Sequence, residues 1–478
     1  MNYRMILFII GQIMKAEGAF MALPIIVGLI YGESHVWVSF GIPMVCQLAA
    51  SFALTLKKPK NNAVFSSEGF VSVALAWIIV SLTGALPFVL SGEIPNFADA
   101  FFETVSGFTT TGATILPDVE ALSRSCLFWR SFTHWIGGMG ILVFALAVMS
   151  SNDSRTMHMM RAECAGPKVG RLVSKSSFSA RILYGIYISM TALEVILLLL
   201  GGMPLFDSLV HSFASAGTGG FSIYADSIGH YDSVYIEMVV AVFIILFGVN
   251  FNLYYYLIIK KFAQVYKNEE LRVYLGVILT ATVLIAVNIF NIYDSVGSSL
   301  RYSFFMVAST ITSTGFATAD FTLWPEFSQT IILALMFIGS CAGSTGGGMK
   351  ISRWIILVKT GLKELKYVLN PRAVVSVKMD GKPVEQDVIR GVTSYSILFV
   401  LIFVISMLLV SLDRYSIEET FSGVATCINN VGYGVGRLGP AGSFGGMNNF
   451  STVILSIDML IGRLEIYPLL MIFTIRRK

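Results

Sequence analysis

Long apolar runs follow one another through most of this chain, and they constrain its fold more than any other feature. Most are long enough to cross roughly 30 Å of hydrocarbon as helices. The runs lie near 5–30 and 36–56, then at Val71–Leu90, Leu127–Met149, Ile182–Leu200, Val234–Leu257, Val273–Ile292, from Thr330 past a glycine run, at Tyr395–Leu412 and at Val453–Phe473. Only 13% of the residues are charged, whereas a soluble protein carries about 25%. We therefore expect an all-α polytopic membrane protein with about ten spanning helices.

Lysine and arginine gather in alternate loops between these runs. The basic loops lie near 57–60, 155–181, 260–272, 359–390 and 476–478. By the positive-inside rule these loops and both termini are cytoplasmic, and the intervening, more acidic loops face outward. Residues 1–30 are expected to stay as a helix, because Lys15 and Glu17 interrupt the run and no small-residue cleavage site follows. The net charge of +4 therefore reports topology and does not predict nucleic-acid binding.

The side chains that usually carry catalysis are scattered. The five cysteines show no CxxC spacing and no histidine partners at metal-ligand distance, so neither a zinc site nor a disulfide framework is predicted. A membrane enzyme would need clustered titratable or metal-binding residues near one face. The sequence also has no strand-linked GxGxxG outside the apolar runs. We expect that the chain is not an enzyme and holds no organic cofactor.

A glycine-centred loop recurs four times, each time between two apolar runs on the predicted outer side. Its glycines are Gly112, Gly219, Gly315 and Gly432. Each ends a short semi-polar helix in the aligned segments Phe102–Ala113, Leu209–Gly220, Phe305–Phe316 and Phe421–Gly432. A period of roughly 100 residues containing helix, re-entrant loop and helix predicts four repeated units. We place these pore repeats at 61–165, 166–265, 266–375 and 376–478, after two extra helices in 1–60.

Such loops suit a cation pathway. Non-helical backbone survives at membrane depth only where protein buries it or it lines a water-filled cavity, and glycine permits the unusual dihedral angles. Freed carbonyl oxygens can then replace the hydration shell of a cation. The predicted filter residues are Thr110, Thr111, Gly112, Thr218, Gly219, Thr314, Gly315, Asn430, Val431 and Gly432. The alternative is that small residues only let helices pack closely, but four loops in register favour one pathway for a monovalent cation.

Each predicted pore helix would enter from outside with a capping or acidic residue near its start, so that its negative dipole end points at the cation. These residues are Asp99, Asp207, Ser298 or Ser299, and Ser416 or Glu418.

The glycine run in 339–350 interrupts the second helix of the third repeat. Each glycine costs about 1 kcal/mol relative to alanine in a helix, so the segment is predicted to unwind. The alternatives are a kinked packing interface, or a phosphate-binding loop, which is disfavoured because Lys350 comes one position late and no strand precedes it.

Arg463 lies inside the last apolar run, where an arginine costs at least about 2.5–3.5 kcal/mol, so it is expected to face the pore or a carboxylate. Asp458 and Glu465 are the nearby carboxylates. A structural ion pair between two helices is the alternative. Arg130, in the first repeat, is expected to have a structural role.

At this point the residues resemble a known family, the membrane subunits of the Trk/Ktr/HKT superfamily of potassium transporters, most closely the Trk branch. The resemblance covers essentially the whole chain. It rests on Ser106–Thr114, Phe128–Arg130, Trp135–Gly140, His211–Phe213, Thr218–Ser222, Cys341–Lys350, Asn429–Gly432 and Gly462–Glu465. The resemblance departs at Tyr433, where this branch usually has proline.

The resemblance implies four repeats around one pseudo-fourfold pore, a homodimer with one pore per subunit, and potassium uptake. It implies that glycine at position 112 favours potassium, where serine accompanies sodium in some relatives. The glycine run becomes an intramembrane gating loop under the filter, with Arg463 as a positive barrier beside it. The implied gating residues are Gly343, Gly346, Gly347, Gly348, Lys350 and Arg463.

The resemblance also implies peripheral cytoplasmic nucleotide-binding subunits, regulated by NAD or ATP, for which Glu364–Asp387 and Asn152–Ser179 are the expected contacts. Together, these features predict potassium uptake across a prokaryotic cytoplasmic membrane through a gated pore. An inside-negative potential contributes about 2.3 kcal/mol per charge per 100 mV, enough for roughly fiftyfold accumulation without other coupling. A less selective potassium and sodium transporter, or a cation symporter, is the alternative.

Overall fold

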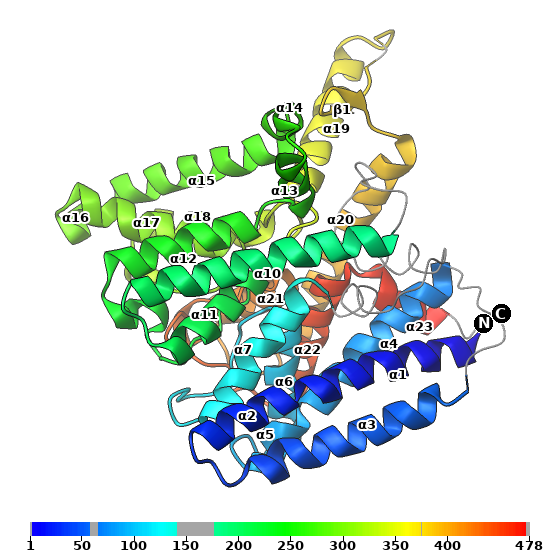
Figure 1. Ribbon diagram of the computed structural model, residues 1–478. Helices are drawn as coiled ribbons and strands as arrows, with labels where there is room; N and C mark the ends of the chain where they lie inside the picture. The colour runs from blue at the N-terminus through cyan, green and yellow to red at the C-terminus, as the bar shows by residue number, and fades with distance from the viewer. Residues whose placement is uncertain (1, 58–65, 141–175, 374, 475–478) are drawn as a thin grey trace.

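The computed structural model describes residues 2–57, 66–140, 176–373 and 375–474 as a bundle of helices (Figure 1). The exception among these residues is a short hairpin of two strands with two residues each, β1 Lys378–Met379 and β2 Lys382–Pro383. Short elements connect the longer helices: η1 Trp37–Gly41, α5 Leu86–Ser91, η2 Ser227–Tyr231, α14 Phe262–Tyr266, α16 Phe290–Tyr293, η3 Phe321–Leu323 and η4 Gly436–Leu438. The predicted all-α class is confirmed.

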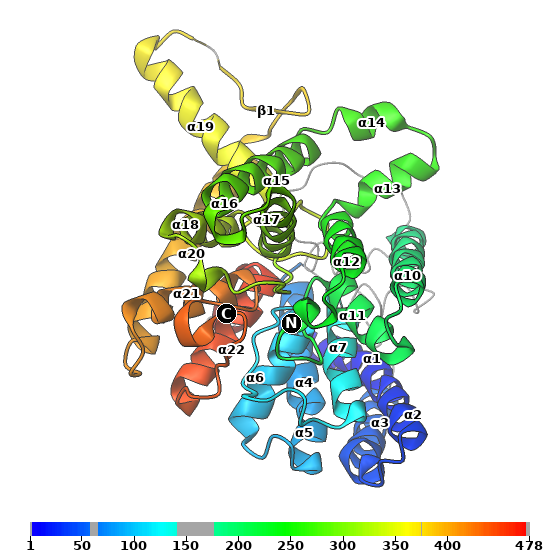
Figure 2. The same cartoon turned by 90° about the vertical axis from the view of Figure 1, so that its left-hand side faces the viewer.

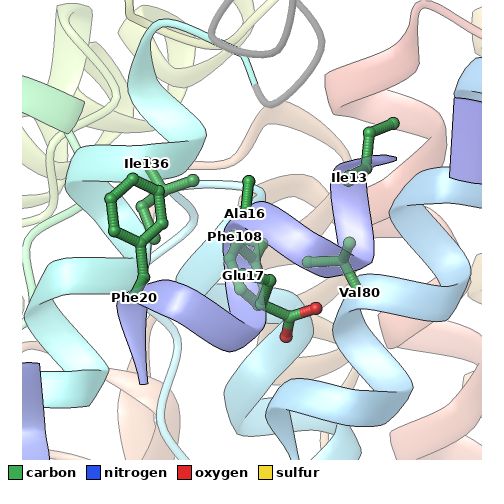
Figure 3. Close-up of a pocket in the computed structure, with 7 residues that line it drawn as sticks. All are labelled: Ile13, Ala16, Glu17, Phe20, Val80, Phe108 and Ile136. Atoms are coloured by element: carbon green, nitrogen blue, oxygen red, sulfur yellow. The ribbon is translucent and has the colours of Figure 1, made fainter. Parts of the chain in front are cut away.

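Two N-terminal spans pack on the first repeat. α1 Tyr3–Phe20 runs almost directly into α2 Ala22–Ile30, and α3 Ile42–Thr55 returns along α1 (Figure 1). The buried carboxylate of Glu17 in α1 accepts hydrogen bonds from Gln47 in α3 and from Thr83 in the first helix of repeat one, the latter at 2.9 Å. Polar contacts of this kind hold helices together in lipid. A small pocket beside Glu17 separates α1 from Val80, Phe108 and Ile136 (Figure 3).

Four units of the same design make up the rest. The first helices are α4 Ser66–Gly84, α10 Ser176–Leu200, α15 Glu269–Asn288 and α20 Gln386–Val410. The pore helices are α6 Phe97–Phe108, α11 Leu205–Gly217, α17 Val296–Ile311 and α21 Ile417–Asn429. The second helices are α7 Arg124–Gly138, α12 Val234–Phe247 with α13 Phe251–Ile258, α18 Glu326–Ile338 with α19 Ile351–Leu369, and α22 Asn449–Leu464 with α23 Tyr467–Thr474.

The four units close into a ring. The second helix of each unit packs against the pore helix of the next: α7 against α11, α12 against α17, α18 against α21, and α22 against α6. Figure 2 shows the units arranged around a common centre, with α19 projecting away from it. The predicted architecture of four repeats plus two N-terminal helices is therefore confirmed.

The part of the chain that the structure describes holds fewer simple spans than the predicted ten, and the end of the predicted run Leu127–Met149 lies outside that part. Among the described residues, six helices are long and apolar enough to cross a membrane, or seven if α12 and α13, bent by 91°, count as one. Ten is reached only by also counting the second helices of the repeats. The run Val234–Leu257 was expected as one span, but it breaks at Gly248–Asn250 because the Asn250 side chain caps a new helix by accepting from the N–H of Asn252 at 2.9 Å.

The pore helices begin close to the predicted starting residues. Asp99 and Asp207 lie in the first turns of α6 and α11, where a negative charge is favourable. Ser416 is the N-cap of α21 and forms a capping box with Glu419. In the third repeat the N-cap is Ser295, so the predicted Ser298 and Ser299 lie inside the helix.

Candidate functional site

All four pore helices end in the same backbone motif. A residue in the left-handed region follows each helix, and the next backbone N–H donates to the carbonyl five residues earlier. In these hydrogen bonds Thr111 donates to Ser106, Gly219 to Ala214, Thr314 to Ser309, and Val431 to Thr426, at 2.8–2.9 Å. This is a Schellman cap, which turns the chain sharply away from the helix axis. The cap aims the following carbonyls in one common direction relative to each pore helix.

The left-handed residues of these caps are Thr110, Thr218, Ser313 and Asn430, with φ of 54–55°. A left-handed conformation costs a non-glycine residue roughly 1–2 kcal/mol. Two residues later, Gly112, Gly220, Gly315 and Gly432 are again left-handed. The structure thus corrects one predicted position, because the equivalent of Gly112 in the second repeat is Gly220, not Gly219. The equivalent of Thr110 in the third repeat is Ser313, which was not among the predicted filter residues.

The four glycines form a closed ring of contacts with carbonyl groups. A Cβ atom at Gly112 would lie 2.0 Å from the carbonyl oxygen of Gly219 in the next repeat. The corresponding Cβ positions lie 1.9 Å from Thr314 for Gly220, 2.3 Å from Val431 for Gly315, and 2.8 Å from Thr111 for Gly432. The filter glycine of each repeat therefore packs against a backbone carbonyl of the next repeat, and the glycine of the fourth repeat packs against a carbonyl of the first. Only glycine leaves room for this approach.

Most of the threonine side chains at this level hydrogen bond to neighbouring residues, and one does not. Thr111 hydrogen bonds to Thr109 at 2.7 Å and accepts from the Asn430 amide at 2.9 Å. Thr314 hydrogen bonds to Thr312 at 2.7 Å. Among the described residues, the buried hydroxyl of Thr110 has no hydrogen-bond partner. The ring therefore offers mainly backbone carbonyls, without a fixed charge.

The segment 339–350 is non-helical, as predicted, and lies directly under two filter segments. The N–H of Gly347 donates to Ser313 Oγ at 2.5 Å. A Cβ at Gly346 would meet the carbonyl of Thr312 at 2.7 Å, and one at Gly347 would meet that of Asn429 at 2.4 Å. The segment therefore occupies the space below the third and fourth carbonyls of the ring.

The break in α12 supplies the other anchor of this segment. The N–H of Cys341 donates to the freed carbonyl of Gly248 at 3.1 Å, and that of Phe251 donates to Gly343 at 3.0 Å. Two interrupted helices thus satisfy each other's backbone groups, which is the condition for irregular backbone at membrane depth.

Arg463 joins the second helices of the first and fourth repeats to the same segment. Its guanidinium donates to the carbonyl of Thr345 at 2.7 Å and to that of Gly138 at 2.8 Å, and also to Gly137. The two carboxylates expected as its partners are used elsewhere: Glu465 pairs with Arg353 at 2.6 Å, and Asp458 accepts from Ser406 at 2.7 Å.

Lys350 closes the segment. Its side chain is buried and donates to the carbonyl of Gly346. Its backbone φ of 74° belongs to the left-handed region. The lysine thus binds the loop to itself, and with Arg463 it places two cationic side chains below the carbonyl ring.

Known proteins share this fold. A family model described as TrkH, cation transport protein, matches residues 39–477. The chain belongs to the TrkH family. The Trk system potassium uptake protein TrkH of Salmonella typhimurium is 36% identical over 99% of both chains, and TrkG of Escherichia coli K12 is 34% identical over 99% of this chain and 98% of the relative. The crystal structure of the potassium transporter TrkH from Vibrio parahaemolyticus superposes with a TM-score of 0.89 at 31% identity, over 99% of this chain and 98% of that one.

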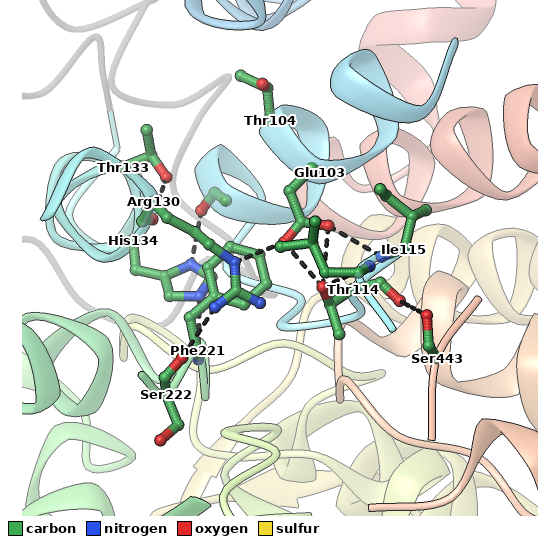
Figure 4. A network of polar contacts seen from close by, with 12 residues as sticks. Glu103, Thr104, Thr114, Ile115, Arg130, Thr133, His134, Phe221, Ser222 and Ser443 are labelled. Carbon is green, nitrogen blue, oxygen red and sulfur yellow. Dashed lines mark hydrogen bonds and ion pairs between the residues drawn. The ribbon is translucent and has the colours of Figure 1, made fainter. Parts of the chain in front are cut away.

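In this TrkH-family chain a buried ion pair between Arg130 and Glu103 contacts the backbone that follows the filter glycines (Figure 4). Arg130 Nε lies 2.5 Å from Glu103 Oε1, and Nη1 donates to the carbonyl of Ser222 at 2.9 Å. The Arg130 guanidinium covers the ring of Phe221 at 3.6 Å. Glu103 in turn accepts from the N–H of Ile115 at 2.9 Å. The pair thus braces the backbone that follows the filter in both the first and second repeats, in agreement with a structural role for Arg130.

Replacing Arg130 with methionine should lower the stability of the protein by about 3–5 kcal/mol, because Glu103 would remain buried without its partner. Thermal unfolding in detergent measures the effect. Arg437→Met is the matched control, because the Arg437 side chain, which pairs with Glu419, is 68% exposed. In this variant the loss of stability should stay below about 1 kcal/mol. Equal losses in the two variants would contradict a special role for the buried pair.

Gly220 and Ser313 were missed, although the sequence held a signal for each. Phe221 follows Gly220 as Phe316 follows Gly315, and aligning these aromatic residues gives the correct register. Ser313 already lies opposite Thr110 when Gly315 is aligned with Gly112. The carbonyls that accept from Arg463 could not be predicted, because they belong to the first and third repeats.

Proposed function

We propose that this chain carries potassium into the cell through a gated, selective pore at the centre of the four repeats. The ring of contacts between glycines and carbonyls is the observation that carries the proposal. Carbonyl oxygens on a backbone held by four identical caps can replace the hydration shell of a monovalent cation. The C-terminal ends of four pore helices add negative potential at the same place. The relatives are named potassium uptake proteins, which favours potassium as the ion.

The proposed filter consists of the predicted residues with Gly220 and Ser313 added. Thr110, with its unpartnered hydroxyl, and Asn430, with its unpartnered Oδ1, are the filter side chains that can supply an oxygen. In this proposal the carbonyls of Thr111, Gly219, Thr314 and Val431 form one ligand level, because each belongs to the residue before the left-handed glycine.

The segment 339–350 is the proposed gate, with Gly343, Gly346, Gly347, Gly348, Lys350 and Arg463 as its working residues. The segment contacts Ser313 above it, and its own Thr345 accepts a hydrogen bond from Arg463 beside it. These contacts hold the segment in the path below the ring. Opening requires that these bonds break and that the loop leaves the space below the ring. Two cationic side chains below the ring add an electrostatic barrier to a cation.

The proposed setting is the cytoplasmic membrane of a prokaryote, with both termini inside and two copies of the chain in a homodimer. Nucleotide-binding regulatory subunits would dock on the basic cytoplasmic face. The hairpin within Glu364–Asp387 suits such contact, because Asp380 accepts from the N–H of Glu269 at 2.7 Å and ties the hairpin to α15. The other predicted contact, Asn152–Ser179, lies almost wholly outside the described residues.

The test is ion flux in vesicles that contain the purified protein. Under an imposed inside-negative potential, we expect uptake of potassium or rubidium and much slower uptake of sodium. Equal uptake of sodium would favour the less selective transporter. A flux that requires a sodium or proton gradient, at zero potential, would favour a symporter. Vesicles that carry neither potassium-driven current nor rubidium flux would end the proposal.

A further inference from the structure

In three of the four repeats, the residue that follows the filter glycine has an aromatic side chain. It packs at the boundary with the preceding repeat, and we call each such boundary a seam. These residues are Phe221, Phe316 and Tyr433, all buried, with Ala113 at the equivalent place in the first repeat. Phe221 packs on His134 of the preceding repeat at 4.2 Å, and Phe316 lies 5.9 Å from His211 of the preceding repeat. Tyr433 continues the pattern, but it alone carries a hydroxyl.

The hydroxyl of Tyr433 crosses from the fourth repeat to the third. It lies 2.7 Å from Thr310 Oγ1 in the pore helix α17. Thr310 donates its own proton to the carbonyl of Met306 at 2.7 Å, so the tyrosine is the donor in the bond between them. The tyrosine ring also contacts Phe321 of the third repeat, with centroids 5.3 Å apart.

Thr310 belongs to the cap that positions the third filter segment. Its carbonyl accepts the N–H of Ser313 at 3.0 Å, at the left-handed residue of that cap. A single hydroxyl therefore connects the fourth filter segment to the cap of the third. It acts only two residues beyond Val431, whose carbonyl belongs to the ring.

The fourth segment is the one whose geometry departs from the others. Gly432 has a φ of 112°, while the other three filter glycines have φ of 78–86°. Its Cβ position would also lie farthest from the neighbouring carbonyl, 2.8 Å from Thr111, compared with 1.9–2.3 Å at the other seams. The ring is thus tightest where the second repeat meets the third, at 1.9 Å, and widest where the fourth meets the first.

We propose that Tyr433 is a specificity-determining residue of the pathway, which holds the fourth filter segment against the third repeat through its bond to Thr310 and thereby sets the width of the ring. The inference rests on the proposed function. Tyr433 does not contact the ion. It acts through the position of the Val431 and Gly432 backbone, and loss of its hydroxyl lets that segment move across the wide seam toward the first repeat.

The test compares Tyr433→Phe, Thr310→Val and the double variant in vesicles, by the ratio of rubidium to sodium permeability. A buried hydrogen bond contributes about 0.5–1.5 kcal/mol, so each single variant should lower the ratio by about 2- to 10-fold. The double variant should be no worse than either single one, because the same bond is lost. Rubidium flux itself should persist.

Tyr293→Phe is the matched control. Its hydroxyl takes part in a hydrogen bond of the third repeat away from the filter, here as the acceptor from Trp324 Nε1 at 3.2 Å. It should change thermal stability by a similar amount and leave the permeability ratio as in the unmodified protein. An unchanged ratio in Tyr433→Phe and Thr310→Val, or additive losses in the double variant, would overturn the inference. Loss of rubidium flux in the unmodified protein would instead overturn the proposed function.

Discussion

A serine in place of Gly112 is expected to reduce the preference for potassium or rubidium over sodium by at least about tenfold. Two effects add at this position. The φ of 84° costs any side chain about 1–2 kcal/mol, and the new Cβ would lie 2.0 Å from the carbonyl oxygen of Gly219. Since 1.4 kcal/mol corresponds to a factor of ten, moving that carbonyl out of the ring suffices. The measurement is the reversal potential of vesicle currents with potassium and sodium on opposite sides.

Gly92→Ser separates these two effects. Gly92 has a similar φ of 79° but no heavy atom within 4 Å of its Cβ position, and it directly follows α5. It should lose stability through backbone strain while keeping the selectivity of the unmodified protein. If Gly112→Ser kept that selectivity as well, Gly112 would have no place in the filter.

Replacing Arg463 with glutamine is expected to raise the potassium flux of the closed protein by roughly 10- to 100-fold. The guanidinium holds the loop through the carbonyl of Thr345, and a hydrogen bond to a charged group contributes about 1.5–3 kcal/mol. Its loss shifts the loop toward the open position by the corresponding factor. Removal of the positive charge below the ring acts in the same direction.

Arg463→Lys distinguishes the two contributions. A lysine keeps the charge but cannot reproduce the planar set of donors that reaches both Thr345 and Gly138. A rise in flux for glutamine alone would mean that the charge closes the pathway, and equal rises would mean that the hydrogen bonds do. Unchanged flux in both variants would contradict a gating role for Arg463.

The residues under the ring show why side-chain partners are hard to predict from sequence. Asp458 and Glu465 are close to Arg463 along the chain, and a helix periodicity makes either one plausible. In the folded protein, Glu465 begins the break after α22 with a φ of 59° and turns to Arg353 of the third repeat. Arg463 instead reaches carbonyls at the end of α7 and in the segment 339–350.

The fourfold repeat, the membrane class, the glycine loops and the unwound segment 339–350 were determined by the sequence alone, because each depends on local composition and spacing. The period of hydrophobic runs and the position of glycines are one-dimensional properties. What only the tertiary structure decided is the set of contacts that closes the ring of glycines and carbonyls, the partners of Arg463, and the bond from Tyr433 to Thr310. Each of these joins different repeats across the ring, and the contact depends on backbone direction that local sequence does not specify.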